Sequence, residues 1–499
     1  MKVERLKGLK IFWALAVFAF VVLGAAAVWL GGLNQDEGWY LYAAKMVAEG
    51  KMLYRDFFFT QGPEMPEFYK AFIWAWGSWG LLGARVFTLM IGFAGIFFSV
   101  CLAQRLAPEG RKSEAALIAF LLLGCNLYHL YYVAIPKTYA LASMWVMSGF
   151  LVLSYWSKKP IALIIAGFAF AFAAGTRISL GAILCVIGLW MLGSRQWKSL
   201  LWFCVGGFGG LALVYGPYLC DAGAREGLIA AQQYHAARGG FDLVWAVGSV
   251  SRLVRWYLPV FIVLGLGVGI KVEKKGGGGQ RNILLLVSFL AVFIVQMLAP
   301  FPYEDYQVPV MGLLAVYAAV TFVKNTNTPL STSTSSLHLL LVLGLCFANS
   351  FGSPLLEKWM TNGQDRFWSL KKEKCEMAQL RDVAKRIEAQ DPGGKTLLTQ
   401  DLYLAIETGR TVPKGLEMGP FAMLTDEEWR KLLTETSPAE CKIAALSGYA
   451  FAIEPPVCKE RSVEKQMEYW TLLKQNYKLV DREEMFGQNA TTLLMLKRK

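Results

Sequence analysis

The chain has 499 residues, of which 55% are hydrophobic, and its formal net charge is +13. This composition excludes an ordinary soluble protein, in which apolar residues make up about 45–50% of the chain. The positive charge does not indicate a nucleic-acid partner, because Lys and Arg accumulate in the cytoplasmic loops of membrane proteins. We therefore expect a polytopic membrane protein that lies in a lipid bilayer and binds no nucleic acid.

Eleven apolar segments approach or reach the roughly 20 residues that a helix needs to cross a bilayer. They cover 11–33, 81–104, 114–132, 138–156, 160–176, 178–193, 199–219, 256–270, 281–299, 307–323 and 336–352. The first is too long for the core of a signal peptide, so we expect a retained span. The predicted fold class is mainly α, a helical membrane bundle of about eleven spans.

The distribution of Lys and Arg predicts the orientation of this bundle. Basic residues gather in alternate loops, at 1–10, 105–112, 158–159, 195–198 and 271–281. By the positive-inside rule these loops are cytoplasmic, and so is the amino terminus. The predicted location is the inner (plasma) membrane. The chain beyond 352 is then periplasmic or extracellular.

The first outer loop, 34–80, opens with a helix signal in an unusually charged and aromatic stretch. Asn34 can cap a helix, and Glu37 three residues later can complete a capping box. Gly50 is placed to end the helix. The spacing predicts a short amphipathic helix at the membrane surface, with the carboxylate of Asp36 at its start.

The sequence changes character after 352, where it becomes charged and resembles a soluble protein. We expect domains at 1–352 and 353–499, the second an α/β module with its own core that covers the outer mouth of the bundle. The expected helices are 373–388 and 402–408, and the expected strands are 395–399, 449–453 and 492–496. An oxidising compartment makes Cys441 and Cys458 the expected disulfide pair.

Ionisable residues at membrane depth are costly, so those near the outer ends of the spans are candidates for function. Cationic or titratable side chains there could bind the phosphate of a lipid. These candidates are Lys51, Arg55, Arg85, Arg177 and His235. No pair among the nine cysteines has metal-ligand spacing, and the chain has only three histidines. We expect no metal site and no cofactor.

Several motifs resemble a known family of membrane enzymes. Asp36-Glu37-Gly38-Trp39-Tyr40, Tyr54-Arg55-Asp56 and Gln61-Gly62-Pro63 resemble the first-loop signature of bacterial GT-C glycosyltransferases. The nearest group within them is related to protein O-mannosyltransferases and to the lipid A aminoarabinose and galacturonic acid transferases. The chain departs from the aminoarabinose branch, which has Lys-Pro-Pro where this sequence has Gln61-Gly62-Pro63.

The resemblance implies an enzyme that moves a monosaccharide from a polyprenyl phosphate to an acceptor on the outer side, with inversion. The acceptor is a lipid, a polysaccharide or a protein. In that family the first acidic residue of the first outer loop is the catalytic base, which here is Asp36, and Asp56 is the second candidate. The residues expected to line the substrate site are Glu37, Tyr40, Tyr54, Gln61, Tyr303, Glu304 and Asp305.

Two other functions remain open at this point. A transporter or flippase for lipid-linked sugars explains the spans, but it explains poorly an acidic outer loop and a large outer domain. A glycan polymerase or ligase of the outer leaflet would carry its key groups in the later loop 220–255, which contains His235 and Arg238.

Overall fold

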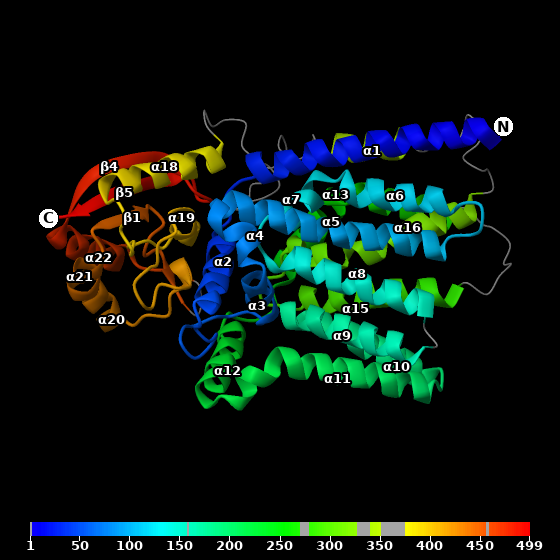
Figure 1. The fold of residues 1–499 in the computed structure, drawn as a ribbon, viewed down its shortest axis with the longest axis horizontal. Coiled ribbons are helices and arrows are strands. Elements are labelled where there is room, and N and C mark those ends of the chain that lie inside the picture. Colours follow the sequence, from blue (N-terminus) through cyan, green and yellow to red (C-terminus); the bar gives the residue numbers. More distant parts are fainter. Residues whose placement is uncertain (1, 157–158, 270–278, 327–339, 351–374, 456–458) are drawn as a thin grey trace.

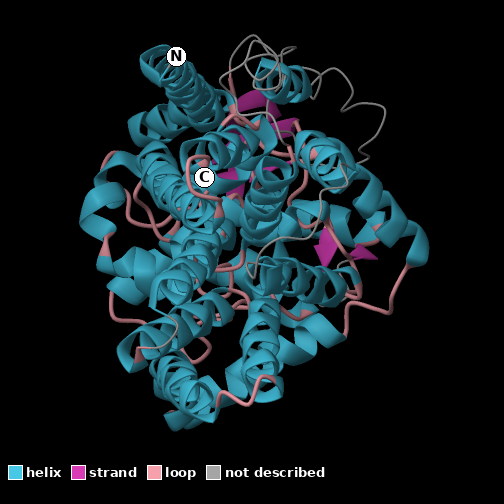
Figure 2. Cartoon of the chain, turned by 90° about the vertical axis from the view of Figure 1, so that its right-hand side faces the viewer, coloured by secondary structure: helices cyan, strands magenta, loops and turns pink. Residues whose placement is uncertain are grey.

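The computed structural model describes residues 2–156, 159–269, 279–326, 340–350, 375–455 and 459–499. Long helices lie side by side in one part of the molecule, and a small C-terminal unit of helices and strands lies beyond one end of them (Figure 1). Figure 2 looks along these helices and shows them packed into a bundle. The predicted fold class, a helical bundle with a C-terminal α/β unit, is confirmed.

The helical part follows the predicted spans closely. Among the described residues, five helical stretches are long and apolar enough to cross a membrane, or up to seven if each of two bent helix pairs is one span. Shorter apolar helices at Pro160–Thr176, Ile178–Gly193, Asn282–Met297 and Leu340–Ser350 correspond to the other expected spans. The total of eleven remains a prediction, because length and composition do not assign these four.

The helices of this part are α1 (Lys2–Leu30), α2 (Gln35–Ala48), α3 (Glu64–Ala71), α4 (Ile73–Trp76), η1 (Gly77–Trp79), α5 (Gly80–Leu106), α6 (Lys112–Gly124), α7 (Leu127–Ala134), α8 (Thr138–Trp156), α9 (Pro160–Thr176), η2 (Ile178–Leu180), α10 (Gly181–Gly193), α11 (Trp197–Cys220), α12 (Ala222–Ala236), α13 (Leu243–Trp256), α14 (Leu258–Gly269), α15 (Gly279–Met297), η3 (Glu304–Gln307) and α16 (Val308–Asn325). Of these, α2 and α12 run across the end of the bundle that faces the C-terminal unit (Figure 1).

Two sharp bends shape this end of the bundle. The axes of α6 and α7 differ by 69°, and those of α13 and α14 by 79°. Asn126 fills the first break: its Oδ1 accepts the His129 N–H at 3.1 Å, which caps α7, and its Nδ2 donates to the Trp256 carbonyl at 2.9 Å. One side chain thus satisfies backbone groups at both breaks and ties them together.

Helix α2 begins as predicted but lies in a different environment. The capping box of Asn34 and Glu37 is present. The prediction of an amphipathic surface helix is wrong, because α2 is buried on most sides, between the bundle and α19 (Leu402–Glu407) of the C-terminal unit. A Cβ at Gly38 would lie 2.4 Å from the backbone nitrogen of Tyr403, so only glycine permits this close approach.

A fully buried ion pair fixes α2 to α5 and to the end of α1. Arg85 of α5 donates to both carboxylate oxygens of Glu37, at 2.7 and 2.6 Å, and neither side chain is exposed. The guanidinium also donates to three carbonyl groups where α1 ends, those of Val28, Gly31 and Gly32. Because all of these groups are out of water, each depends on the others for its hydrogen bonds.

The C-terminal unit contains a three-stranded antiparallel sheet in the order β1-β5-β4, formed by β1 (Ile443–Ser447), β5 (Thr491–Arg498) and β4 (Tyr477–Phe486). A small hairpin pairs β2 (Ile453–Glu454) with β3 (Lys459–Glu460). The helices are α18 (Glu376–Gln390), α19, η4 (Gly419–Phe421), α20 (Asp426–Lys431), η5 (Leu432–Thr436), α21 (Ser437–Glu440) and α22 (Val463–Asn476).

Part of the predicted secondary structure of this unit is corrected. The helices near 373–388 and 402–408 and the strand near 492–496 are found. The strand expected at 449–453 lies instead at Ile443–Ser447, and the chain turns at Phe451, whose φ is +65°. Segment 395–399 forms only isolated bridges, through Thr396 and Leu398. The pairing of Cys441 with Cys458 lies outside the described residues.

Arg85→Ala tests whether the buried pair supports the fold. We expect it to lower the free energy of unfolding by about 3–5 kcal/mol, since it leaves the Glu37 carboxylate buried without its partner. Arg55→Ala is the matched control, because Arg55 is 44% exposed beside its acidic partners and such exposed pairs contribute little to stability. Unfolding in detergent measures both, and equal losses would contradict the expectation.

Candidate active site

A cavity of about 760 Å³ lies where α2, α7, α13 and η3 meet the C-terminal unit. Its charged lining residues all come from the membrane part: Asp36, Lys137, Arg177, Arg238, Asp242, Arg252, Glu304 and Asp305. The C-terminal unit contributes uncharged residues, namely Met418, Phe421, Tyr449, Gln488 and Asn489. The two walls of the cavity therefore differ in charge.

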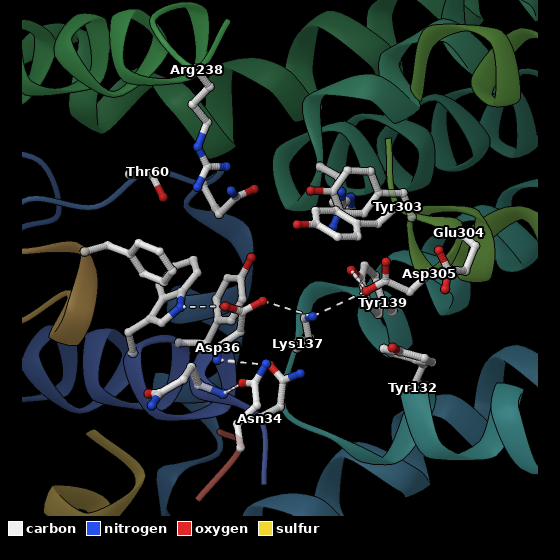
Figure 3. Close-up of a pocket in the computed structure, with 18 of the residues that line it drawn as sticks. Asn34, Asp36, Thr60, Tyr132, Lys137, Tyr139, Arg238, Tyr303, Glu304 and Asp305 are labelled. Carbon is white, nitrogen blue, oxygen red and sulfur yellow. Dashed lines mark hydrogen bonds and ion pairs between the residues drawn. The ribbon is translucent and has the colours of Figure 1, made fainter. Parts of the chain in front are cut away.

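Asp36 opens α2 and presents its carboxylate to this cavity (Figure 3). Its backbone N–H donates to Oδ1 of Asn34 at 3.0 Å, and its own Oδ1 accepts the indole N–H of Trp39 at 3.1 Å. The Asp36 side chain is still 32% exposed. The carboxylate is thus oriented by its own helix and remains accessible from the cavity.

Lys137 joins Asp36 to a second carboxylate. It lies between α7 and α8, its side chain is only 6% exposed, and its Nζ is 2.9 Å from Oδ2 of Asp36 and 3.4 Å from Oδ2 of Asp305. The Tyr139 hydroxyl donates to the same Asp305 oxygen at 2.7 Å. Figure 3 shows the ammonium between the two carboxylates. Three elements that are distant in sequence therefore meet at one cation.

The electrostatics of Asp36 follow from this arrangement. Its enclosed position opposes ionisation, but the ammonium of Lys137, with help from the Trp39 N–H and the charge of Arg238, outweighs that effect. The pKa of Asp36 is therefore held below its usual value. The carboxylate is ionised at neutral pH and can accept a hydrogen bond or a proton.

Two cations that lie over aromatic rings also line the cavity. The guanidinium of Arg177 lies 4.5 Å from the ring centre of Tyr306 and 5.0 Å from that of Tyr139, and it donates to the Thr138 hydroxyl at 3.1 Å. Arg238 lies 5.1 Å from the ring centre of Tyr234. In the described chain no carboxylate forms an ion pair with Arg177, so its charge is available to an anion.

Seven residues predicted from the sequence line this cavity together: Asp36, Tyr40, Gln61, Arg177, Tyr303, Glu304 and Asp305. Glu304 accepts from Nε of Arg252 at 3.0 Å, so this carboxylate is already paired. The described residues contain no cluster of three or more His, Cys, Asp or Glu side chains that could hold a metal ion.

Lys51, Arg55 and Asp56 do not reach the cavity. Lys51 is exposed. Arg55 binds both oxygens of Asp56 and pairs with Asp221 at 3.3 Å. The Arg55 guanidinium and the Met52 N–H lower the pKa of Asp56 to about 2. These three predicted site residues thus lie outside the cavity lining, and Arg55 and Asp56 neutralise each other at the protein surface.

Four more predicted residues lie behind the cavity wall. Arg85 and Glu37 neutralise each other inside the protein. The Tyr54 hydroxyl donates to the Gln61 carbonyl, and His235 Nε2 donates to the Thr60 carbonyl at 2.7 Å. Burial also lowers the pKa of His235, so its ring is neutral. The structure therefore does not bring these four side chains to the cavity lining.

Sequence analysis did not assign the bridge made by Lys137, nor the contributions of Tyr139 and the C-terminal unit. A lysine between two apolar segments was a recognisable signal, since a charge at that depth requires partners. Nothing in the sequence indicated which carboxylates would be the partners. Nothing in the sequence indicated that Gln488 and Asn489 would reach this cavity.

No protein-family model and no curated protein matches the chain. Solved structures do resemble it. ArnT from Cupriavidus metallidurans, a lipid A aminoarabinose transferase solved with undecaprenyl phosphate, has a TM-score of 0.60 at 13% identity over 97% of both chains. Its apo form gives 0.59.

A second resemblance is to the arabinofuranosyltransferase AftD from Mycobacteria. Its TM-score is 0.50 at 13% identity, over 97% of this chain and 40% of that one. Both similar proteins are GT-C glycosyltransferases. The likeness shows that this chain has the GT-C fold and confirms, for the fold, the resemblance predicted from the first loop.

Lys137→Met tests the electrostatic account of the site. Burial raises the pKa of Asp36 and the Lys137 ammonium lowers it. Without the ammonium the effect of burial is less well compensated, so we expect the pKa of the Asp36 carboxyl to rise. Lys137→Arg keeps the charge and should keep the pKa low. Isotope-edited infrared titration of the aspartate carboxylates in detergent measures both variants. An unchanged Asp36 titration in Lys137→Met would show that another group sets its ionisation.

Proposed function

We propose that the protein is a glycosyltransferase that moves a monosaccharide from a polyprenyl-phosphate donor to an acceptor hydroxyl, with inversion at the anomeric carbon. The observation that carries this proposal is the ionised, partly exposed carboxylate of Asp36 in a cavity that also holds the guanidinium of Arg177, with which no described carboxylate forms an ion pair. The GT-C fold supports it, since one protein of similar fold was solved with undecaprenyl phosphate.

Asp36 acts as the base in this proposal. It accepts the proton of the acceptor hydroxyl while the hydroxyl oxygen forms a bond to the anomeric carbon. The bond between that carbon and the phosphate oxygen breaks, and its electron pair leaves with the lipid phosphate. Lys137 keeps Asp36 ionised before the reaction and, with Trp39, holds it in one orientation.

Arg177 and Arg238 bind the leaving phosphate in this proposal. The phosphate gains negative charge as the bond breaks, and fixed guanidinium groups stabilise a developing charge without having to reorganise. Arg177 is held by two aromatic rings and one hydroxyl, which leaves its charge free for the donor. These two residues replace the Lys51, Arg55, Arg85 and His235 expected from sequence.

The uncharged wall of the cavity is our candidate for the acceptor side. It consists of side chains of the C-terminal unit, including Phe421, Tyr449, Gln488 and Asn489. Aromatic faces and amides of this kind suit the rings and hydroxyls of a carbohydrate. With basic loops in the cytoplasm, this wall faces the periplasm or the cell exterior, where lipid-linked donors replace nucleotide sugars.

Asp36→Asn tests the base. The amide keeps the size of the side chain and can still accept a hydrogen bond from Lys137, but it cannot take up the proton. We expect turnover to fall by about 10²–10⁴-fold with donor binding largely retained. The assay mixes purified protein in detergent with polyprenyl-phosphate sugars and follows loss of the sugar.

Asp56→Asn is the matched control, because it removes the same charge from the same loop outside the cavity. It should turn over like the unmodified protein. If Asp56→Asn lost activity and Asp36→Asn kept it, the catalytic base would be Asp56 and not Asp36. Donor binding without any sugar release, under every condition, would favour a transporter.

Arg177→Met tests the phosphate site. Loss of one charged hydrogen bond should weaken binding of a polyprenyl phosphate by about 1.5–3 kcal/mol. Arg55→Met, in which an exposed cation outside the cavity is removed, should bind as before. Titration of detergent-solubilised protein with the lipid phosphate measures both, and unchanged affinity in Arg177→Met would place the phosphate elsewhere.

An outer-leaflet glycan polymerase or ligase is the second candidate, because residues of the later loop reach the same cavity. Arg238, Asp242 and Arg252 all line it. In such an enzyme the donor carries a glycan on a lipid diphosphate. Supplying both donor types to the same protein separates the two activities by the product formed.

A further inference from the structure

The residues that lead into α2 are held by side chains of the C-terminal unit. The Leu33 N–H donates to Oε2 of Glu376 at 2.6 Å, and the Gln35 N–H donates to Oε1 of Gln488 at 2.6 Å. The Gln35 side chain donates through Nε2 to Oδ1 of Asp401 at 2.9 Å. Gln35 directly precedes Asp36, so these contacts fix the first turn of the helix that carries the proposed base.

Among the described residues, no cation forms an ion pair with the buried carboxyl group of Asp401. It is 1% exposed, and it interacts with Gln35 of α2, Tyr403 of α19 and Ser447 of β1. The Tyr403 hydroxyl, the only titratable group among these three, donates to Oδ1 at 2.9 Å. By contrast Asp391, in the same unit, pairs with Arg410 at 2.9 Å and Lys442 at 3.3 Å.

Two buried acceptor atoms at this contact have no hydrogen-bond partner among the described residues. One is Oδ2 of Asp401, and the other is Oε1 of Gln35. Ser447 lies near the carboxyl group and favours its charged form, but it makes no hydrogen bond of good geometry to Oδ2. An unpartnered buried acceptor costs about 1–3 kcal/mol, and a buried charge costs more.

One proton on Oδ2 of Asp401 would give a hydrogen bond to both unpartnered atoms. A carboxylic acid carries one O–H donor, and the Gln35 amide has one acceptor left once its Nε2 has donated. We propose that Asp401 is held as a neutral carboxylic acid that pairs with the Gln35 amide through two hydrogen bonds, Nε2–H to Oδ1 and Oδ2–H to Oε1, and thereby positions Asp36.

The electrostatics agree with this geometry. Burial raises the pKa of Asp401 even though Gln35, Tyr403 and Ser447 favour its ionised form. Tyr403, which donates to Asp401, stays neutral, because burial and the nearby acids Asp401, Glu376 and Glu37 raise the pKa of its hydroxyl. The neutral form is therefore favoured by folding, and its contribution is lost as pH rises through the folded pKa of Asp401.

Asp401 is thus a positioning residue with a pH dependence of its own. The proposed base requires Asp36 to be ionised, which limits activity at low pH. The two-point pair requires Asp401 to be protonated, which limits activity at high pH. The effect on turnover rests on the proposed function, but the protonation of Asp401 does not.

Asp401→Asn separates the proton from the negative charge. Its amide can donate from Nδ2 to Oε1 of Gln35 at every pH, so we expect turnover close to that of the unmodified protein and no decline at high pH. Asp401→Ala and Gln35→Ala both remove the pair and should lower kcat about 10–100-fold, with a nearly unchanged donor KM.

Tyr42→Phe is the control for a general loosening of this contact. It removes one hydrogen bond between α2 and the C-terminal unit, from the Val412 N–H, at a distance from Gln35 along the helix. It should leave the pH profile unchanged. If the activity of Tyr42→Phe also failed to decline at high pH, as expected for Asp401→Asn, the specific role of Asp401 would be overturned.

Infrared spectroscopy tests the protonation without any assay of activity. The unmodified protein at neutral pH should show the C=O band of a buried carboxylic acid, and Asp401→Asn should lack it. Absence of that band, or an Asp401→Asn variant as impaired as Asp401→Ala, would show that a carboxylate is required and would overturn the proposal. If the C=O band is present but the protein transfers sugar to no acceptor, only the proposed function is overturned.

Discussion

The ammonium group of Lys137 lies out of water between Asp36 and Asp305, and much of the structure depends on that contact. A buried cation without partners is strongly destabilising, so α2, the junction of α7 and α8, and η3 must converge for the fold to be stable. The same contact keeps Asp36 ionised in the cavity. The electrostatic requirement of the fold and the chemistry proposed for the site are therefore met by one side chain.

Neighbouring acids in the first loop have opposite roles. Residues adjacent on a helix point about 100° apart, so Asp36 faces the cavity while Glu37 faces Arg85 in the interior. The sequence allowed this division to be predicted in part, because the capping box assigned Glu37 to the helix start and left Asp36 for the site. It did not indicate the ion pair, in which the two residues are 48 positions apart.

Whether a feature could be predicted depended on whether the residues that determine it are close together in the sequence. The apolar segments and the start of α2 were predictable because each depends on residues close in sequence. The pairings of Arg55 with Asp221 and of Arg85 with Glu37 could not be predicted, because only the fold brings these acids near the two arginines. Strand β1, Ile-Ala-Ala-Leu-Ser, is buried along its whole length and lacks the alternation that marks a half-buried strand. The β-branched and aromatic residues at 449–453 fit a strand better by pattern, but the chain turns there.

The contact between Gln35 and Gln488 joins positions 453 residues apart, and it has a consequence for biosynthesis. The ribosome delivers the membrane helices first, so Asp36 and Lys137 are synthesised long before the side chains of the C-terminal unit that hold Gln35. Until the β4–β5 turn emerges, the cavity stays open on that side to solvent, and water could compete with the acceptor for the sugar. The closed cavity, with the first turn of α2 held by Gln488, therefore forms only after nearly the whole chain has been made.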